Sequence, residues 1–188
     1  MRNTIKTSVL LFAIAISANT FGQKKEINAS ESTINWTGKK VTGSHEGTLS
    51  FSDGYLVFDG DNITGGEFTV DMTSLTVTDL EAGKGKEKLE GHLNSDDFFG
   101  VENHQTAKLV VKKAKKNGDS YKVAGDLTIK GKTNPIEFDL KVDGATATTN
   151  LKVDRTKYDI KYGSGSFFDN LGDKAIYDDF ELAVVLKM

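Results

Sequence analysis

The sequence predicts an all-β protein, an antiparallel β-barrel of about eight strands with a short helical insertion. Apolar and polar residues alternate with a period of two in one segment after another, which is typical of strands with one buried face. The 188 residues also include 19 glycines and a single proline, a composition that suits many tight turns between strands. Sequential antiparallel strands of this kind commonly close into a barrel.

The clearest alternation runs from Tyr121 to Val142 and predicts two strands around a turn at 131–134. The residues between the inward positions are mostly charged, so they are expected to face solvent. The inward positions are apolar or glycine: Tyr121, Val123, Gly125, Leu127, Ile129, Ile136, Phe138, Leu140 and Val142. Rows of this kind must cover either a packed core or an apolar ligand.

The remaining strands are predicted in chain order. The first starts at Ile34 and Trp36, and later ones cover 67–72, 107–111, 145–153 and 180–186. Between them, 47–51 and 55–58 are predicted as two strands joined by a turn at 52–54, because Ser-Asp-Gly is a turn sequence.

The pattern changes between Asp79 and Phe99, where leucines and many charged residues predict a short helix. Three glycines at 83, 85 and 91 are expected to break this helix, and Ser95 is expected to cap a further turn that carries Phe98 and Phe99. The segment 158–177 is predicted to be a loop.

The N-terminal residues 1–22 are predicted to be a secretory signal peptide. Arg2 and Lys6 precede the apolar run 9–16, which is too short for a permanent membrane helix. Cleavage is expected after Gly22, with Ala18 as the alternative. The domain would then cover 23–188 without an integral membrane segment.

Charge argues against nucleic acid and anionic lipid surfaces as partners of the mature chain. Removing Arg2 and Lys6 from the 24 basic residues leaves 22 against 27 acidic residues, a net charge of −5. The lysine-rich run 112–116 is interpreted as a solvated hairpin end. Because the chain has no cysteine, its stability must come from the core and not from disulfides.

Several segments together resemble one family, and they occur in the family's order over nearly all of the mature chain. They are Ser32–Trp36, Gly43–Leu49, Gly66–Met72, Lys88–Leu93, Asp97–Phe99, Gly125–Gly131, Val153–Tyr158 and Asp178–Leu182. The chain is similar to the YceI-like lipid- and polyisoprenoid-binding proteins of the bacterial periplasm. It differs from them at Gln105, where relatives usually carry a proline, and in the long loop 162–175.

The resemblance implies an elongated, lipocalin-like barrel in the periplasm that holds a long-chain lipid or isoprenoid in an apolar tunnel. It implies no cofactor and no catalytic activity, and pairing into a homodimer stays open. The tunnel-lining candidates are bulky residues near the helical insertion and the loops, followed by bulky residues on the strands. These candidates are Leu89, Leu93, Phe98, Phe99, Phe167 and Phe168, and then Trp36, Phe68, Met72 and Phe138. Other inward residues, such as Leu127 and Val184, are interpreted as core.

Arg155 is the charged candidate, because it follows an apolar strand and precedes Tyr158 and Ile160. It either meets a polar ligand head group at the end of the tunnel or pairs with a carboxylate such as Asp126 or Asp154. The pattern of residues leaves both interpretations open, with the carboxylate pair slightly favoured.

Two other functions are alternatives to lipid binding. A metal-dependent enzyme would use the three histidines, His45, His92 and His104, but their spacing is not that of a metal motif. A structural or stress-related barrel with a filled core would bind no ligand. Nucleophilic catalysis is disfavoured because the chain lacks cysteine and a Gly-x-Ser-x-Gly motif.

Overall fold

The structure is a computed structural model, which describes residues 22–188. The predicted signal peptide lies outside the described residues, except for Gly22. The elements are β1 (Gln23–Glu26), β2 (Thr33–Lys40), β3 (Gly43–Asp59), β4 (Asn62–Val77), α1 (Lys86–Asn94), β5 (Thr106–Asn117), β6 (Ser120–Ile129), β7 (Lys132–Asp143), β8 (Thr146–Asp154) and β9 (Ile176–Lys187). Short 3₁₀ turns cover Arg155–Tyr158 and Gly172–Lys174.

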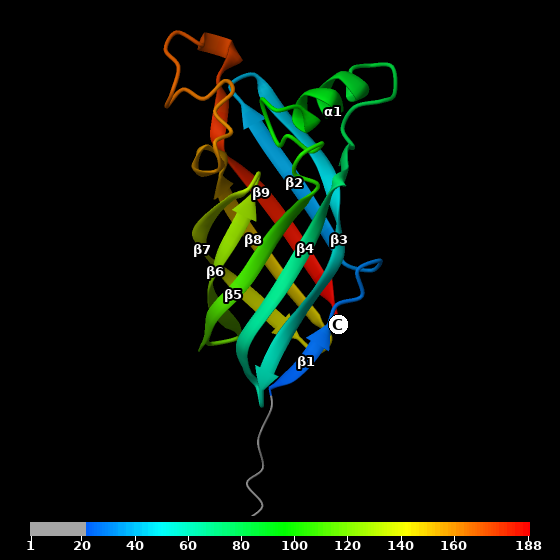
Figure 1. The fold of residues 1–188 in the computed structure, drawn as a ribbon, viewed down its shortest axis with the longest axis vertical. Coiled ribbons are helices and arrows are strands. Elements are labelled where there is room, and N and C mark those ends of the chain that lie inside the picture. Colours follow the sequence, from blue (N-terminus) through cyan, green and yellow to red (C-terminus); the bar gives the residue numbers. More distant parts are fainter. Residues whose placement is uncertain (1–21) are drawn as a thin grey trace, which may run out of the picture.

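Strands β2 to β9 form a closed antiparallel barrel of eight strands, as predicted (Figure 1). The strands lie in the order β3-β2-β9-β8-β7-β6-β5-β4, and pairing of β4 with β3 closes the ring. The ninth strand, β1, was not predicted, because its sequence Gln-Lys-Lys-Glu carries no apolar alternation. It is held by backbone pairing with the segment 55–58 of β3.

The turn predicted at 52–54 is wrong, because β3 runs continuously through it. The strand absorbs the irregularity as a shift in register against β4 between Phe51 and Asp53. Gly54 is required here for close packing: a Cβ atom at this position would lie 2.5 Å from Cδ1 of Phe68. A Ser-Asp-Gly sequence therefore serves as a bulge that lets an aromatic ring lie against the backbone.

Helix α1 lies over one end of the barrel, which we call the rim, together with the β2–β3 turn and the loop 155–175 (Figure 1). The predicted break at Gly91 is wrong, since α1 passes through it. A turn that carries Phe98 and Phe99 follows Ser95, as predicted, and the Ser95 carbonyl accepts from the N–H of Phe98 at 3.0 Å. The Ser95 hydroxyl does not cap this turn but ends α1, where it donates to the carbonyl of His92 at 2.7 Å. No helix within residues 22–188 is long and apolar enough to cross a membrane.

Candidate functional site

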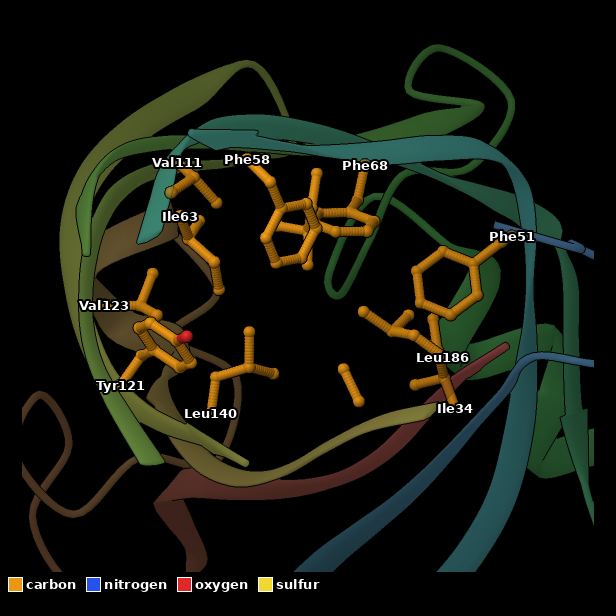
Figure 2. Close-up of a cluster of buried hydrophobic side chains, with 12 residues drawn as sticks. Ile34, Phe51, Phe58, Ile63, Phe68, Val111, Tyr121, Val123, Leu140 and Leu186 are labelled. Atoms are coloured by element: carbon orange, nitrogen blue, oxygen red, sulfur yellow. The ribbon is translucent and has the colours of Figure 1, made fainter. Parts of the chain in front are cut away.

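The barrel interior is mostly apolar, with Arg155 and Thr149 as buried polar residues on its wall. At the end opposite the rim, side chains from strands all around the barrel point toward its axis (Figure 2). A second buried cluster, which includes Met72, Phe98 and Tyr158, fills the space nearer the rim. The strands place these residues inside because alternate residues of each strand face the same side.

Between the two clusters lies a cavity of ≈ 90 Å³, which we call the deep cavity. All eight barrel strands contribute to its wall, and the side chains are almost entirely aliphatic or aromatic. They include Ile34, Phe51, Phe68, Leu127, Phe138 and Val184. Lys108 also lies on this wall, but its ammonium group pairs with Glu67 at 2.7 Å.

Two further cavities continue from the deep cavity toward the rim. The upper cavity, of ≈ 70 Å³, shares Leu182 with the deep cavity. The rim cavity, of ≈ 90 Å³, lies under α1 and shares Trp36, Leu93 and Phe98 with the upper cavity. The three cavities therefore form a sequence of apolar spaces that leads from the middle of the barrel to α1.

Helix α1 is tied to the barrel by one carboxylate. Oε1 of Glu90 accepts hydrogen bonds from the Thr76 hydroxyl at 2.7 Å and from the main-chain N–H of Val77 at 2.8 Å. These bonds, first the one from Val77, lower the pKa of Glu90 because they stabilise its charged form. No residue of α1 is fully buried. The helix therefore covers the rim cavity through this carboxylate and through partly buried side chains such as Leu93, which packs against the cluster near the rim.

Trp36 has an unusual environment at the upper cavity. Its indole ring packs against the backbone of Gly47, where an added Cβ atom would lie 2.5 Å from Cζ2 of the ring. The side chain is 8% exposed, and its Nε1–H donates no hydrogen bond within the described part of the chain. A buried N–H group without a protein partner is uncommon.

Arg155 is buried, with 3% of its surface exposed, and lines the upper cavity. Its guanidinium group donates to three main-chain carbonyls: Tyr177 at 3.0 Å, Ile160 at 2.8 Å and Ile176 at 3.0 Å. Burial lowers the pKa of Arg155, an effect that the nearby charge of Asp178 opposes. Arg155 thus fastens the loop after β8 to the start of β9.

The carboxylate nearest to Arg155 differs from the two that the sequence suggested. Asp178 has its Oδ1 3.7 Å from the guanidinium group. Asp126 instead pairs with Lys112 at 3.3 Å on the outer surface, and Asp154 caps the following turn by accepting from the N–H of Thr156 at 3.0 Å. The sequence could not identify Asp178, because it lies 23 residues further along the chain on another strand.

The structure brings most of the predicted tunnel-lining residues together. Trp36, Leu93, Phe98, Phe99 and Arg155 line the upper cavity, Leu89 lines the rim cavity, and Phe68 and Phe138 line the deep cavity. Met72 is buried but lines none of these three cavities. Phe167 and Phe168 are half-exposed on the rim loop, and the ammonium group of Lys161 lies 5.1 Å from the ring centroid of Phe167.

Sequence reasoning missed several residues of the deep cavity. Leu127 and Val184 pack against the core clusters, as interpreted, but they also lie on the wall of the deep cavity. Thr149 was not singled out, although it is a hydroxyl residue at an inward position between Ala147 and Leu151. Its side chain is 8% exposed, and its Oγ1 has no hydrogen-bond partner among the described residues.

The three histidines lie in different surroundings. His45 Nδ1 lies 2.8 Å from Oδ2 of Asp79, and the His92 ring stacks edge-on against Phe98 and Tyr162. The His104 ring lies beside the turns at Gly100 and Gly131, where an added Cβ atom would lie 3.4 Å from the ring. Within residues 22–188, no group of three or more His, Asp or Glu residues is arranged to hold a metal ion.

Known proteins that resemble this chain share its barrel. Among solved structures, BcnA of Burkholderia cenocepacia superposes with a TM-score of 0.67 at 21% identity, over 85% of this chain and 98% of that one. A polyisoprenoid-binding domain from Saccharophagus degradans superposes with a TM-score of 0.58 at 13% identity, over 89% and 99% of the two chains. Similarities at these identities show a common fold.

Sequence comparison adds the family. A UPF0312 protein of Serratia proteamaculans is 34% identical over 98 residues, which is 52% of this chain and 48% of that protein. Protein YceI of Escherichia coli is 31% identical over 98 residues, or 52% and 49% of the two chains. The matched part thus spans about half the length of these relatives. The YceI-like domain matches residues 26–188, and the chain therefore belongs to the YceI-like domain family.

Proposed function

We propose that this protein binds one long-chain amphiphile, a polyisoprenoid or fatty-acid derivative, inside the barrel and carries it in the periplasm. The observation that supports this proposal most directly is the series of apolar cavities from the deep cavity to α1. A barrel of eight strands has room either for packed side chains or for one small ligand. The polyisoprenoid-binding domain of Saccharophagus degradans, which has the same fold, agrees with the ligand class.

The energetics of such binding favour an apolar interior. Burying a chain of ~15–20 methylene groups contributes roughly 12–16 kcal/mol at ~0.8 kcal/mol each. Association itself costs about 4–15 kcal/mol. Useful affinity therefore requires a cavity wall on which no charged group has to lose its hydration when the ligand binds. The deep cavity meets this condition, because the one lysine on its wall is already paired with Glu67.

Native mass spectrometry on protein purified from the periplasm tests this proposal, followed by organic extraction and lipid analysis. We expect a mass adduct that extracts as a long-chain lipid. A protein that carries no adduct, and gains none after incubation with polyprenyl and fatty-acyl lipids, would favour a barrel without a ligand.

A matched pair of variants locates the bound lipid. Val184 lines the deep cavity, whereas the next residue of β9, Val185, does not. We expect Val184→Phe to abolish the adduct, because the larger ring fills the cavity. Val185→Phe should keep it. Equal retention by both variants would place the lipid outside the deep cavity.

A further inference from the structure

The barrel wall is incomplete at one place, between β7 and β8. These two strands pair only at Lys141↔Thr148, Val142↔Ala147 and Asp143↔Thr146. By contrast, β7 forms ten pairs with β6 on its other side, and β8 forms nine with β9. The next shortest ladder within the barrel, β4–β5, has six pairs. We call the unpaired stretch, 135–140 of β7 and 149–153 of β8, the seam.

The seam has defined ends. Near the rim, the side-chain amide of Asn134 donates to the main-chain carbonyl of Lys157 at 2.9 Å, which holds β7 close to the turn after β8. At the other end the ladder resumes at Lys141 and Thr148. Between these points, the described strands β7 and β8 form no further ladder pair.

The deep cavity lies directly behind the seam. Ile136, Phe138 and Leu140 from β7 line it, and so do Thr149 and Leu151 from β8. The inner side chains on both sides of the seam therefore face the same apolar space. Any separation of β7 from β8 would open this space to the outside through the wall of the barrel.

Two residues at the seam break the local rules of a paired strand. Pro135, the only proline of the chain, lies on β7 where the seam begins. Proline lacks an N–H group and is found in sheets at edges, so β7 is built here as an edge. Thr149 lies on β8 where the ladder ends, and its buried hydroxyl has no partner.

A ligand larger than the deep cavity requires the side chains or strands around this cavity to move. The deep cavity measures ≈ 90 Å³, whereas ligand pockets for small molecules commonly measure about 300–1,000 Å³. Separating strands breaks ladder hydrogen bonds, each with a net contribution of about 0.5–1.5 kcal/mol. The seam is the part of the wall where the fewest such bonds resist separation.

We propose that the ligand passes sideways into the deep cavity through the seam, and that the Thr149 hydroxyl binds a neutral oxygen function of the ligand. This inference rests on the proposed function, since it specifies how the amphiphile enters and which chemistry it carries. A hydroxyl both donates and accepts a hydrogen bond, so it suits an alcohol or a carbonyl. No free charge lines the deep cavity, which disfavours a charged group at this depth.

A removable staple across the seam tests the route. If the β7–β8 register continued upward, Asp139 would lie opposite Asn150, and both are exposed. Because the chain has no cysteine, the only disulfide that Asp139→Cys with Asn150→Cys can form within one molecule is this one, and dilute protein keeps disulfides between molecules out. A bis-maleimide replaces the disulfide where the strands lie too far apart for one. The matched control is Asn150→Cys with Ala183→Cys, whose positions are partners in the complete β8–β9 ladder.

The probe is all-trans-retinol, a fluorescent isoprenoid alcohol. Its binding is detected by energy transfer from Trp36, the only tryptophan of the chain. Protein loaded with retinol is stapled and mixed with phosphatidylcholine vesicles. We expect the seam staple to slow the release of retinol to the vesicles at least tenfold. For the disulfide, a reductant should restore the original release rate, and for the bis-maleimide, omission of the cross-linker should give that rate. The control staple should release at the unstapled rate.

The outcomes separate the two proposals. Equal release rates with and without the seam staple would overturn the lateral route and leave lipid binding intact. If unstapled protein takes up no retinol, the assigned ligand chemistry is wrong. Lipid binding itself fails only if mass spectrometry also finds no lipid on the protein.

A second comparison tests Thr149 itself. We expect Thr149→Val to weaken retinol binding about fivefold, which corresponds to the loss of one hydrogen bond of about 1 kcal/mol. Binding of anhydroretinol, which lacks the hydroxyl group, should be the same for both proteins. A loss of equal size for both probes would show that the substitution changes the cavity and not a hydrogen bond to the ligand.

Discussion

Replacing Thr149 by valine should stabilise the ligand-free protein, although most substitutions at buried positions destabilise. The Thr149 side chain is 8% exposed, and its hydroxyl oxygen has no hydrogen-bond partner among residues 22–188. An unsatisfied buried polar group costs about 1–3 kcal/mol. Valine replaces the hydroxyl by a methyl group of similar size and suits a strand at least as well as threonine. We therefore expect the free energy of unfolding to rise by about 1 kcal/mol or more.

Urea denaturation of delipidated protein measures this change. The midpoint should rise while the slope with denaturant stays constant, which shows that stability and not compactness has changed. For a domain of this size, 1 kcal/mol corresponds to about 2–4 °C in melting temperature. Thr149→Ser serves as the control, because it keeps the hydroxyl and loses the methyl group, and it should destabilise by about 1 kcal/mol.

A result of the opposite sign would refute this reasoning. If Thr149→Val lowers the free energy of unfolding by more than about 1 kcal/mol, the hydroxyl has a partner in the folded protein, either a main-chain carbonyl or an ordered water. The assignment of Thr149 to a ligand would then lose its basis. Thr148→Val, at the adjacent outward position, should change stability by no more than about 0.5 kcal/mol.

Three further predictions concern the rim. Leu93→Trp should block lipid uptake into the upper and rim cavities without unfolding the protein, whereas Leu93→Met should bind lipid normally. Circular dichroism checks the folding of both variants, and retinol titration checks their binding. Glu90→Gln should loosen α1 and speed hydrogen exchange at the N–H of Val77. The pKa of Glu90 is lowered in the folded state, so the Glu90 carboxylate stabilises the fold above pH 4.5. This stabilisation is lost as the pH falls through the lowered pKa, and Glu90→Gln should remove this acid dependence. Arg155→Ala should destabilise by about 3 kcal/mol or more in urea, because it leaves three carbonyls without a donor. An unchanged urea midpoint would show that water replaces the guanidinium group.

The strands were predictable because each has one apolar face. In β6, Val123 and Ile129 face the core and Lys122 faces solvent, so alternation alone identifies the strand. Alternation fails to identify a strand that is held by backbone hydrogen bonds alone. β1 has no apolar face and is held by hydrogen bonds to β3, so its sequence contains no signal.

The cavities were less predictable, because alternation shows which side chains point inward but not how well they fill the space. Phe68 and Met72 belong to the same inward row of β4, yet Phe68 lines the deep cavity and Met72 lines none of the three. The difference depends on what lies across the barrel. Such contacts join residues far apart in the chain, so alternation along one strand does not predict them.

Two local exceptions in the sequence do carry information about the site. Pro135 interrupts a strand that otherwise alternates regularly, and Thr149 places a hydroxyl in an apolar row. Each is unfavourable for a barrel that only needs to be stable, since proline removes a ladder bond and a buried hydroxyl needs a partner. Both lie on the two strands that border the seam, and natural sequences break local rules chiefly at functional sites. Replacing Pro135 by valine should therefore slow lipid exchange, and replacing Thr149 by valine should raise stability, because function and stability make opposite demands at the seam.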